Sequence, residues 1–91
     1  MKNEIDKIKK SIEISKSHIM QECVLLAVRI SGYNDKPFTE LSAIEKDNVK
    51  HLIAQITECS IGSVDLYIRN PERMGYQKLH ELHLVLIKLS K

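Results

Sequence analysis

A tight turn between two helical segments, within residues 48–70, sets the narrowest limits on the architecture of this chain. Two short helices that cross steeply around a three- to four-residue turn need a small residue where the second helix packs on the first. Ala54 occupies that place, and Cys59 and Ser60 supply an apolar turn residue and a helix cap. Val64 then provides a buried branched side chain about one helical turn further on. The spacing predicts helices over 48–57 and 60–69.

This segment resembles the helix-turn-helix of the lac repressor and lambda repressor classes. The resemblance is carried by Ile53-Ala54 in the first helix, by Cys59-Ser60 at the turn, and by Val64 with Tyr67 or Ile68 facing inward. It covers about a quarter of the chain, and the run 67–86 also resembles the link and following helix of such repressor domains. The resemblance implies that the second helix lies in the major groove of double-stranded DNA.

The resemblance also implies which residues touch DNA. In the lac repressor arrangement the side chains aimed at base edges fall on Ile61, Gly62 and Leu66, none of which can make a bidentate hydrogen bond to a base. Ser60 and Ser63 would contact phosphate at the start of the second helix. The flanking DNA backbone would be contacted by Lys50, Arg69, Asn70 and Arg73. One further departure from the pattern is Glu58, which stands at the turn position where glycine is usual.

Charge gives this interpretation little support. The formal net charge of +2 is below the strongly basic balance of a dedicated nucleic-acid binder. Within 48–75 the cations are offset by Glu58, Asp65 and Glu72, so attraction to phosphate depends on geometry rather than on an overall field. The alternative is a non-enzymatic helical module, such as an inhibitor, immunity protein or adaptor, whose degenerate helix-turn-helix contacts another protein. DNA binding is preferred because the spacing is harder to obtain by accident than an apolar helix.

The rest of the chain also has helical periodicity. Residues 3–31 predict one long helix, or two if Ser17 caps a second one, and Gly32 to Pro37 form a loop. Thr39 is an N-cap for a short helix over 40–46, and Asp47-Asn48 offers a second cap, although 40–57 can be continuous. Residues 70–75 predict a surface connection. The expected fold is a single all-α domain over 1–91, a bundle of four to five helices containing the helix-turn-helix-like corner.

The last helix, predicted over 76–89, has more apolar residues than a single core-facing stripe can hold. Its leucines recur at the three-four spacing of a packing seam, at Leu79, Leu82, Leu86 and Leu89. Other apolar side chains widen that seam, at Leu84, Val85 and Ile87. This excess predicts a homodimer through the C-terminal helix, which would also give a DNA-binding chain its two half-sites.

Other functions find little support in the composition. With 43% hydrophobic and 29% charged residues the chain reads as a globular cytoplasmic protein, since no apolar run approaches the roughly 18 residues of a membrane span and its start lacks an apolar signal core. Cys23 and Cys59 fit reduced thiols. His80 and His83, with Cys59 or His51, lack the clustered spacing of zinc ligands. We expect no metal, no cofactor and no enzymatic activity.

Overall fold

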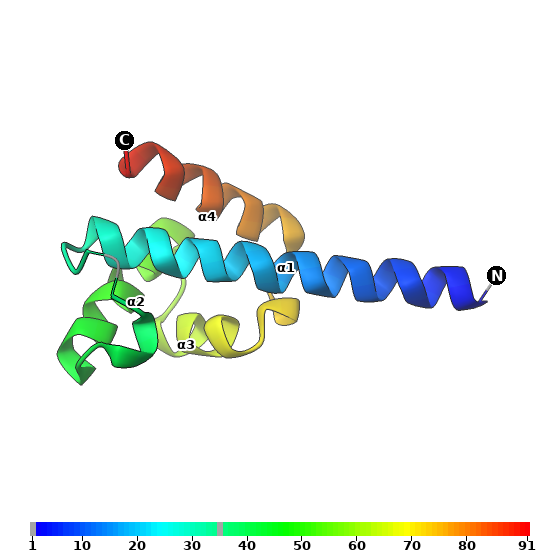
Figure 1. The fold of residues 1–91 in the computed structure, drawn as a ribbon, viewed down its shortest axis with the longest axis horizontal. Helices are drawn as coiled ribbons and strands as arrows, with labels where there is room; N and C mark the ends of the chain where they lie inside the picture. Colours follow the sequence, from blue (N-terminus) through cyan, green and yellow to red (C-terminus); the bar gives the residue numbers. More distant parts are fainter. Residues whose placement is uncertain (1, 35) are drawn as a thin grey trace.

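A computed structural model describes the backbone of residues 2–34 and 36–91 and the side chains of 16–34 and 36–91. Over these residues the chain is helical and contains no strand. Figure 1 shows a long helix α1 with α4 on one side and α2 and α3 on the other. The fold class predicted from the sequence, a small all-α bundle, is therefore confirmed. The elements are α1 (Lys2–Ile30), η1 (Phe38–Glu40), α2 (Ala43–Thr57), α3 (Ile61–Arg69), η2 (Pro71–Arg73) and α4 (Tyr76–Leu89).

Helix α1 is continuous, which decides between the one-helix and two-helix alternatives for residues 3–31. Ser17 lies inside it and caps nothing. The helix ends where Gly32 adopts a positive φ of 91°. There the Tyr33 amide donates to the Val28 carbonyl at 3.2 Å and the Gly32 amide donates to Arg29 at 3.1 Å. This pair of bonds is the Schellman arrangement, which glycine favours because it lacks a Cβ.

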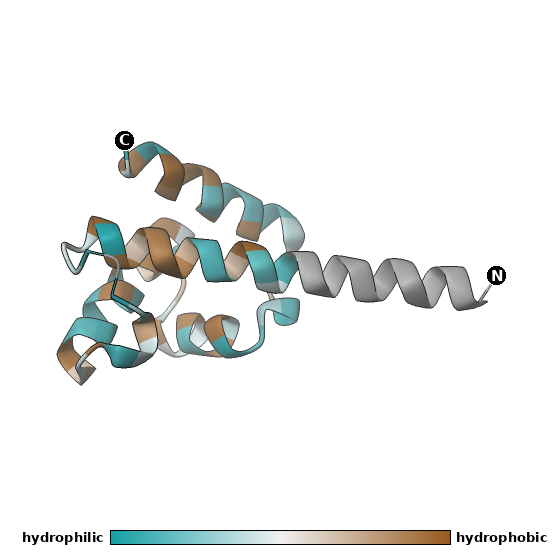
Figure 2. Ribbon diagram, viewed as in Figure 1, coloured by the Kyte–Doolittle hydropathy of each residue, from teal (hydrophilic) through white to brown (hydrophobic). Residues whose placement is uncertain are grey.

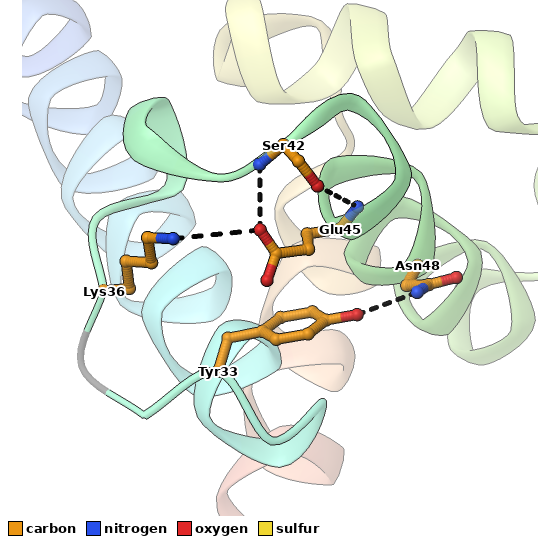
Figure 3. A network of polar contacts seen from close by, with 5 residues as sticks. All are labelled: Tyr33, Lys36, Ser42, Glu45 and Asn48. Carbon is orange, nitrogen blue, oxygen red and sulfur yellow. Dashed lines mark hydrogen bonds and ion pairs between the residues drawn. The ribbon is translucent and has the colours of Figure 1, made fainter.

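Helix α2 starts later than predicted and is not divided. Of the two alternatives for 40–57, the continuous helix holds: α2 runs unbroken from Ala43 to Thr57, so the separate helix over 40–46 is wrong, and Thr39 belongs to η1. Ser42 is the N-cap: its hydroxyl accepts from the Glu45 amide at 3.2 Å, and the Glu45 carboxylate accepts from the Ser42 amide at 2.9 Å. Figure 3 shows this reciprocal pair. Thr39 has no glutamate three residues later, so it cannot form the same capping box.

The second predicted cap, Asp47-Asn48, also lies inside α2. Asn48 instead donates its side-chain amide to the Tyr33 hydroxyl at 2.8 Å (Figure 3). Lys36 reaches the Glu45 carboxylate at 3.8 Å. The loop after α1 is thus tied to the first two turns of α2 by side chains rather than by backbone pairing.

The core lies where α1, α2, α3 and α4 meet, and α1 packs most extensively against α4. Figure 2 shows hydrophobic residues recurring along α4 with hydrophilic residues between them. Leu79, Leu82 and Leu86 are fully buried, whereas Leu89 is 52% exposed. The predicted four-leucine seam therefore holds for three residues and ends before Leu89, which lies in the last turn of α4 beyond the core.

The connection between α3 and α4 is partly buried, which corrects its prediction as a surface segment. Met74 is 1% exposed and belongs to the core cluster. Its carbonyl accepts a hydrogen bond from Lys16 Nζ of α1 at 3.0 Å. Met74 is a single apolar residue that follows the polar residues of η2, so the sequence around it shows no periodicity from which its burial could be predicted. Met74 is buried because α1, which is distant in the sequence, packs against this connection.

Candidate nucleic-acid interface

A short turn at Glu58 to Ser60 joins α2 to α3. Glu58 adopts the left-handed conformation, with φ 58° and ψ 33°, and its amide caps α2 through the Ala54 carbonyl. Ser60 accepts from the Ser63 amide at 3.2 Å and so begins α3. Ala54 and Val64 are 9% and 1% exposed, as expected where α3 packs on α2. The turn closes without glycine because one residue outside the helix can bear the left-handed conformation at moderate cost.

The first turn of α3 is partly open to solvent, at Gly62, and carries no acidic residue. Gly62 is exposed, and a Cβ built on it would meet only the Ser60 hydroxyl oxygen, at 4.0 Å. Packing within the chain therefore does not require glycine at this position. Ser60 and Ser63 are joined through their hydroxyls at 3.0 Å. Amides in the first turn of a helix carry a partial positive charge and point outward, so this end of α3 suits an anion.

The three residues expected at base edges differ in exposure. Gly62 and Leu66 lie on the surface, with Leu66 39% exposed. Ile61 is half-buried and packs against the core cluster, so it presents only part of its side chain. Because Ile61 is half-buried, the exposed surface at these positions is small, with polar residues at the start of α3 and the apolar Leu66 further along. None of Ile61, Gly62 and Leu66 can make a bidentate hydrogen bond to a base.

Asp65 forms ion pairs with two of the cations that the sequence predicts to contact phosphate. Lys50 Nζ lies 2.9 Å from one carboxylate oxygen of Asp65, and Arg69 Nε lies 3.3 Å from the other. The hydrogen bond from Lys50 is the main cause that lowers the pKa of Asp65; desolvation opposes it, and the charges of Lys50 and Arg69 add to the lowering. The Asp65–Arg69 spacing of four residues is readable from the sequence. The Lys50 contact depends on how α2 and α3 cross, and sequence reasoning missed it.

The remaining predicted backbone contacts flank the end of α3. Asn70 terminates α3 and is half-buried, while Arg73 is exposed in η2. Within the described residues no ion pair involves Arg73. Lys50, Asp65 and Arg69 thus form one charged group beside Leu66, and Arg73 lies one short turn beyond it.

The histidines and cysteines do not form a metal site in the described part of the chain. His83 Nε2 lies 2.9 Å from a Glu22 carboxylate oxygen, and His80 stacks on Tyr76 with ring centroids 6.4 Å apart. Burial raises the pKa of the Cys23 thiol to about 12. Desolvation also acts on the half-buried Cys59, but hydrogen bonds with Thr57 and Lys78 outweigh it and lower its pKa.

Comparison of the chain with protein-family models, with curated protein sequences and with solved structures gives no match. Within the residues described, no helix is long and apolar enough to cross a membrane. The case for a function therefore depends on the residues and their geometry.

Proposed function

We propose that this chain is a small DNA-binding protein that acts as a transcriptional regulator, with α3 placed in the major groove. The observation that carries the proposal is the first turn of α3, which exposes Gly62, lacks acidic residues and does not need glycine at this position for the fold. Glycine in open space permits another molecule to approach the backbone closely. A phosphate or a base edge at this helix end would meet free amides and the favourable end of the helix dipole.

The proposed roles follow from the placement of the residues. Ser60, Ser63 and the amides of Ile61 and Gly62 meet phosphate, and Gly62 and Leu66 lie nearest the bases, where Leu66 can touch a thymine methyl group. The flanking DNA backbone is contacted by Lys50, Arg69, Asn70 and Arg73. Asp65 faces the same surface and forms ion pairs with Lys50 and Arg69. Since these pairs compete with phosphate for the two cations, we expect weak non-specific binding to DNA.

A fluorescence anisotropy titration against random duplex DNA, first at low and then at higher salt, tests this proposal. Binding should be detectable at low salt and should weaken as salt rises, because phosphate contacts release counterions. Arg73→Ala should weaken binding to all duplexes alike and reduce the salt slope by about one. Wild-type protein that binds no duplex at low salt would overturn the proposal.

Gly62→Ala is the sharpest variant. Alanine is a better helix former than glycine, and its Cβ meets nothing closer than 4.0 Å, so the free energy of unfolding should stay equal or rise by up to about 1 kcal/mol. DNA affinity should nevertheless fall, because the added methyl group stands between the backbone and the ligand. Gln55→Ala, an exposed site on α2, is the control that should leave affinity unchanged. Undiminished affinity in Gly62→Ala would contradict the role given to this helix end.

A second candidate function, contact with another protein, is favoured by the neutralised charges around Asp65 and by the exposed Leu66 beside them. In that case Leu66→Asp abolishes a complex recovered by pull-down, while wild-type protein shows no affinity for DNA at any salt concentration.

A further inference from the structure

One side of α4 is exposed to solvent, and its Glu81 and Val85 also line a hollow beside the end of α2. Leu84 and Val85 on this side are 47% and 38% exposed, and Glu81 and Lys88 flank them, one on each side along the helix. Separations of three, four and seven residues place all four on one stripe of the helix. No ion pair among the described residues uses Glu81 or Lys88. The stripe is therefore apolar at its centre and has one unpaired charge of each sign at its ends.

This stripe is complementary to itself. Glu81 and Lys88 lie at equal distances from the midpoint between Leu84 and Val85, in opposite directions along α4. If a second copy packs its α4 antiparallel across a twofold axis at that midpoint, each Glu81 faces Lys88 of the second copy. The Leu84 and Val85 side chains of both copies then meet at the centre. In a parallel pair, by contrast, Glu81 would face Glu81 and Lys88 would face Lys88, which is repulsive.

We infer that α4 is an isologous docking surface for α4 of a second copy, packed antiparallel about the Leu84–Val85 midpoint. The same patch serves both copies, as twofold symmetry requires. This inference refines the homodimer expected from the sequence, because Leu79, Leu82 and Leu86 are used by the chain's own core and are not free to pair. The dimer would give the proposed DNA reading its second half-site, but the evidence for it does not depend on that function.

The contact is small, so it belongs with weak associations that bury less than about 1,200 Å². Sedimentation equilibrium without DNA, at protein concentrations up to high micromolar, should show a monomer–dimer equilibrium for the wild-type chain. Glu81→Lys places two cations on the stripe and Lys88→Glu places two anions there. Each variant should weaken self-association about tenfold or more, because two symmetry-related pairs become repulsive.

Mixing the two variants is the decisive measurement. In the mixed dimer the two cations of Glu81→Lys face the two anions of Lys88→Glu, so an equimolar mixture should associate about as well as wild type although neither component does alone. Circular dichroism of each variant verifies that its helices are intact. Glu72→Lys, the same charge change at an exposed position in η2, is the control and should dimerise like wild type.

The inference would be overturned by a wild-type chain that stays monomeric at high micromolar concentration, by single variants that dimerise as well as wild type, or by a mixture no heavier than its components. Loss of dimerisation in Leu25→Lys, on the exposed side of α1, with Glu81→Lys unaffected would also overturn it, because the interface would then be on α1. The DNA titration is independent: a dimer that binds no duplex would overturn the proposed function alone.

Discussion

Asp65 is the residue that sets how much positive charge this surface can offer. It lies within 3.3 Å of both Lys50 and Arg69, and it faces the same side as the start of α3. A carboxylate in this place makes two cations unavailable to phosphate and adds its own repulsion. At the scale of one side chain, therefore, Asp65 offsets the positive charge that Lys50 and Arg69 bring to this corner.

We expect Asp65→Asn to tighten non-specific DNA binding and to steepen its salt dependence, because Lys50 and Arg69 are released. The same substitution should lower the melting temperature slightly at neutral pH. Since the pKa of Asp65 is lowered in the folded chain, its stabilising effect is present above the carboxyl's unfolded pKa and is lost as pH falls through the lower folded value. The difference between the melting temperatures of the two proteins should be largest at neutral pH and should shrink as the pH falls through the acidic range.

Glu58 is a second residue whose effect is local. Its φ of 58° costs an L side chain about 1 kcal/mol, and its negative charge lies at the unfavourable end of α2. Glu58→Gly should therefore raise the free energy of unfolding by about 0.5–1 kcal/mol in urea melts, after allowing for the greater flexibility of glycine. Asn34 has a φ of 59°, and asparagine tolerates this conformation better, so Asn34→Gly should gain less. Equal or lower stability of Glu58→Gly would show that the turn is not strained.

At the scale of elements, the start of α2 depends on a pair of residues rather than on one. Ser42 and Glu45 satisfy each other's amides. Ser42→Ala should lower the free energy of unfolding by about 1 kcal/mol. Thr39→Ala is the matched control, since Thr39 lies in η1 and caps no helix. A larger loss in Thr39→Ala than in Ser42→Ala would place the cap where the sequence suggested.

The sequence predicted the elements better than their contacts. Helices α3 and α4 begin and end within a residue of expectation, because Ser60 and Asn70-Pro71 are local signals. The corner was predictable for the same reason, since Ala54 and Val64 must be small and apolar at fixed spacing. The pairing of Lys50 with Asp65 and the burial of Met74 were not, because both depend on the angle at which one helix crosses another. The site residues themselves stay predictions.

At the scale of the whole molecule, Cys23 reports on global unfolding. It has no exposed surface, and its pKa is raised to about 12, so it should resist thiol reagents in the native state. Cys59, half-buried and with a lowered pKa, should react quickly. Labelling with a chromogenic disulfide should therefore show one fast thiol and one whose rate follows unfolding.

The same group makes stability depend on alkaline pH. The unfolded thiol releases its proton near its ordinary pKa of 9.0, whereas the folded one holds it up to about 12, so stability should fall as pH rises between these values. Cys23→Ala removes this dependence, and Cys59→Ser keeps it. An alkaline stability profile unchanged by Cys23→Ala would show that the buried thiol is not its source.

The buried link between α3 and α4 fixes how these two helices lie relative to each other. Met74 is packed in the core, and its carbonyl accepts a hydrogen bond from Lys16. The connection that contains it therefore holds α3 and α4 at a fixed position relative to each other. In a dimer built on α4 the separation of the two α3 helices would then be a fixed property of the fold. One base pair added between half-sites moves the second by about 3.4 Å and turns it by roughly a tenth of a turn. A protein of this build would read not only two short sequences but the number of bases between them.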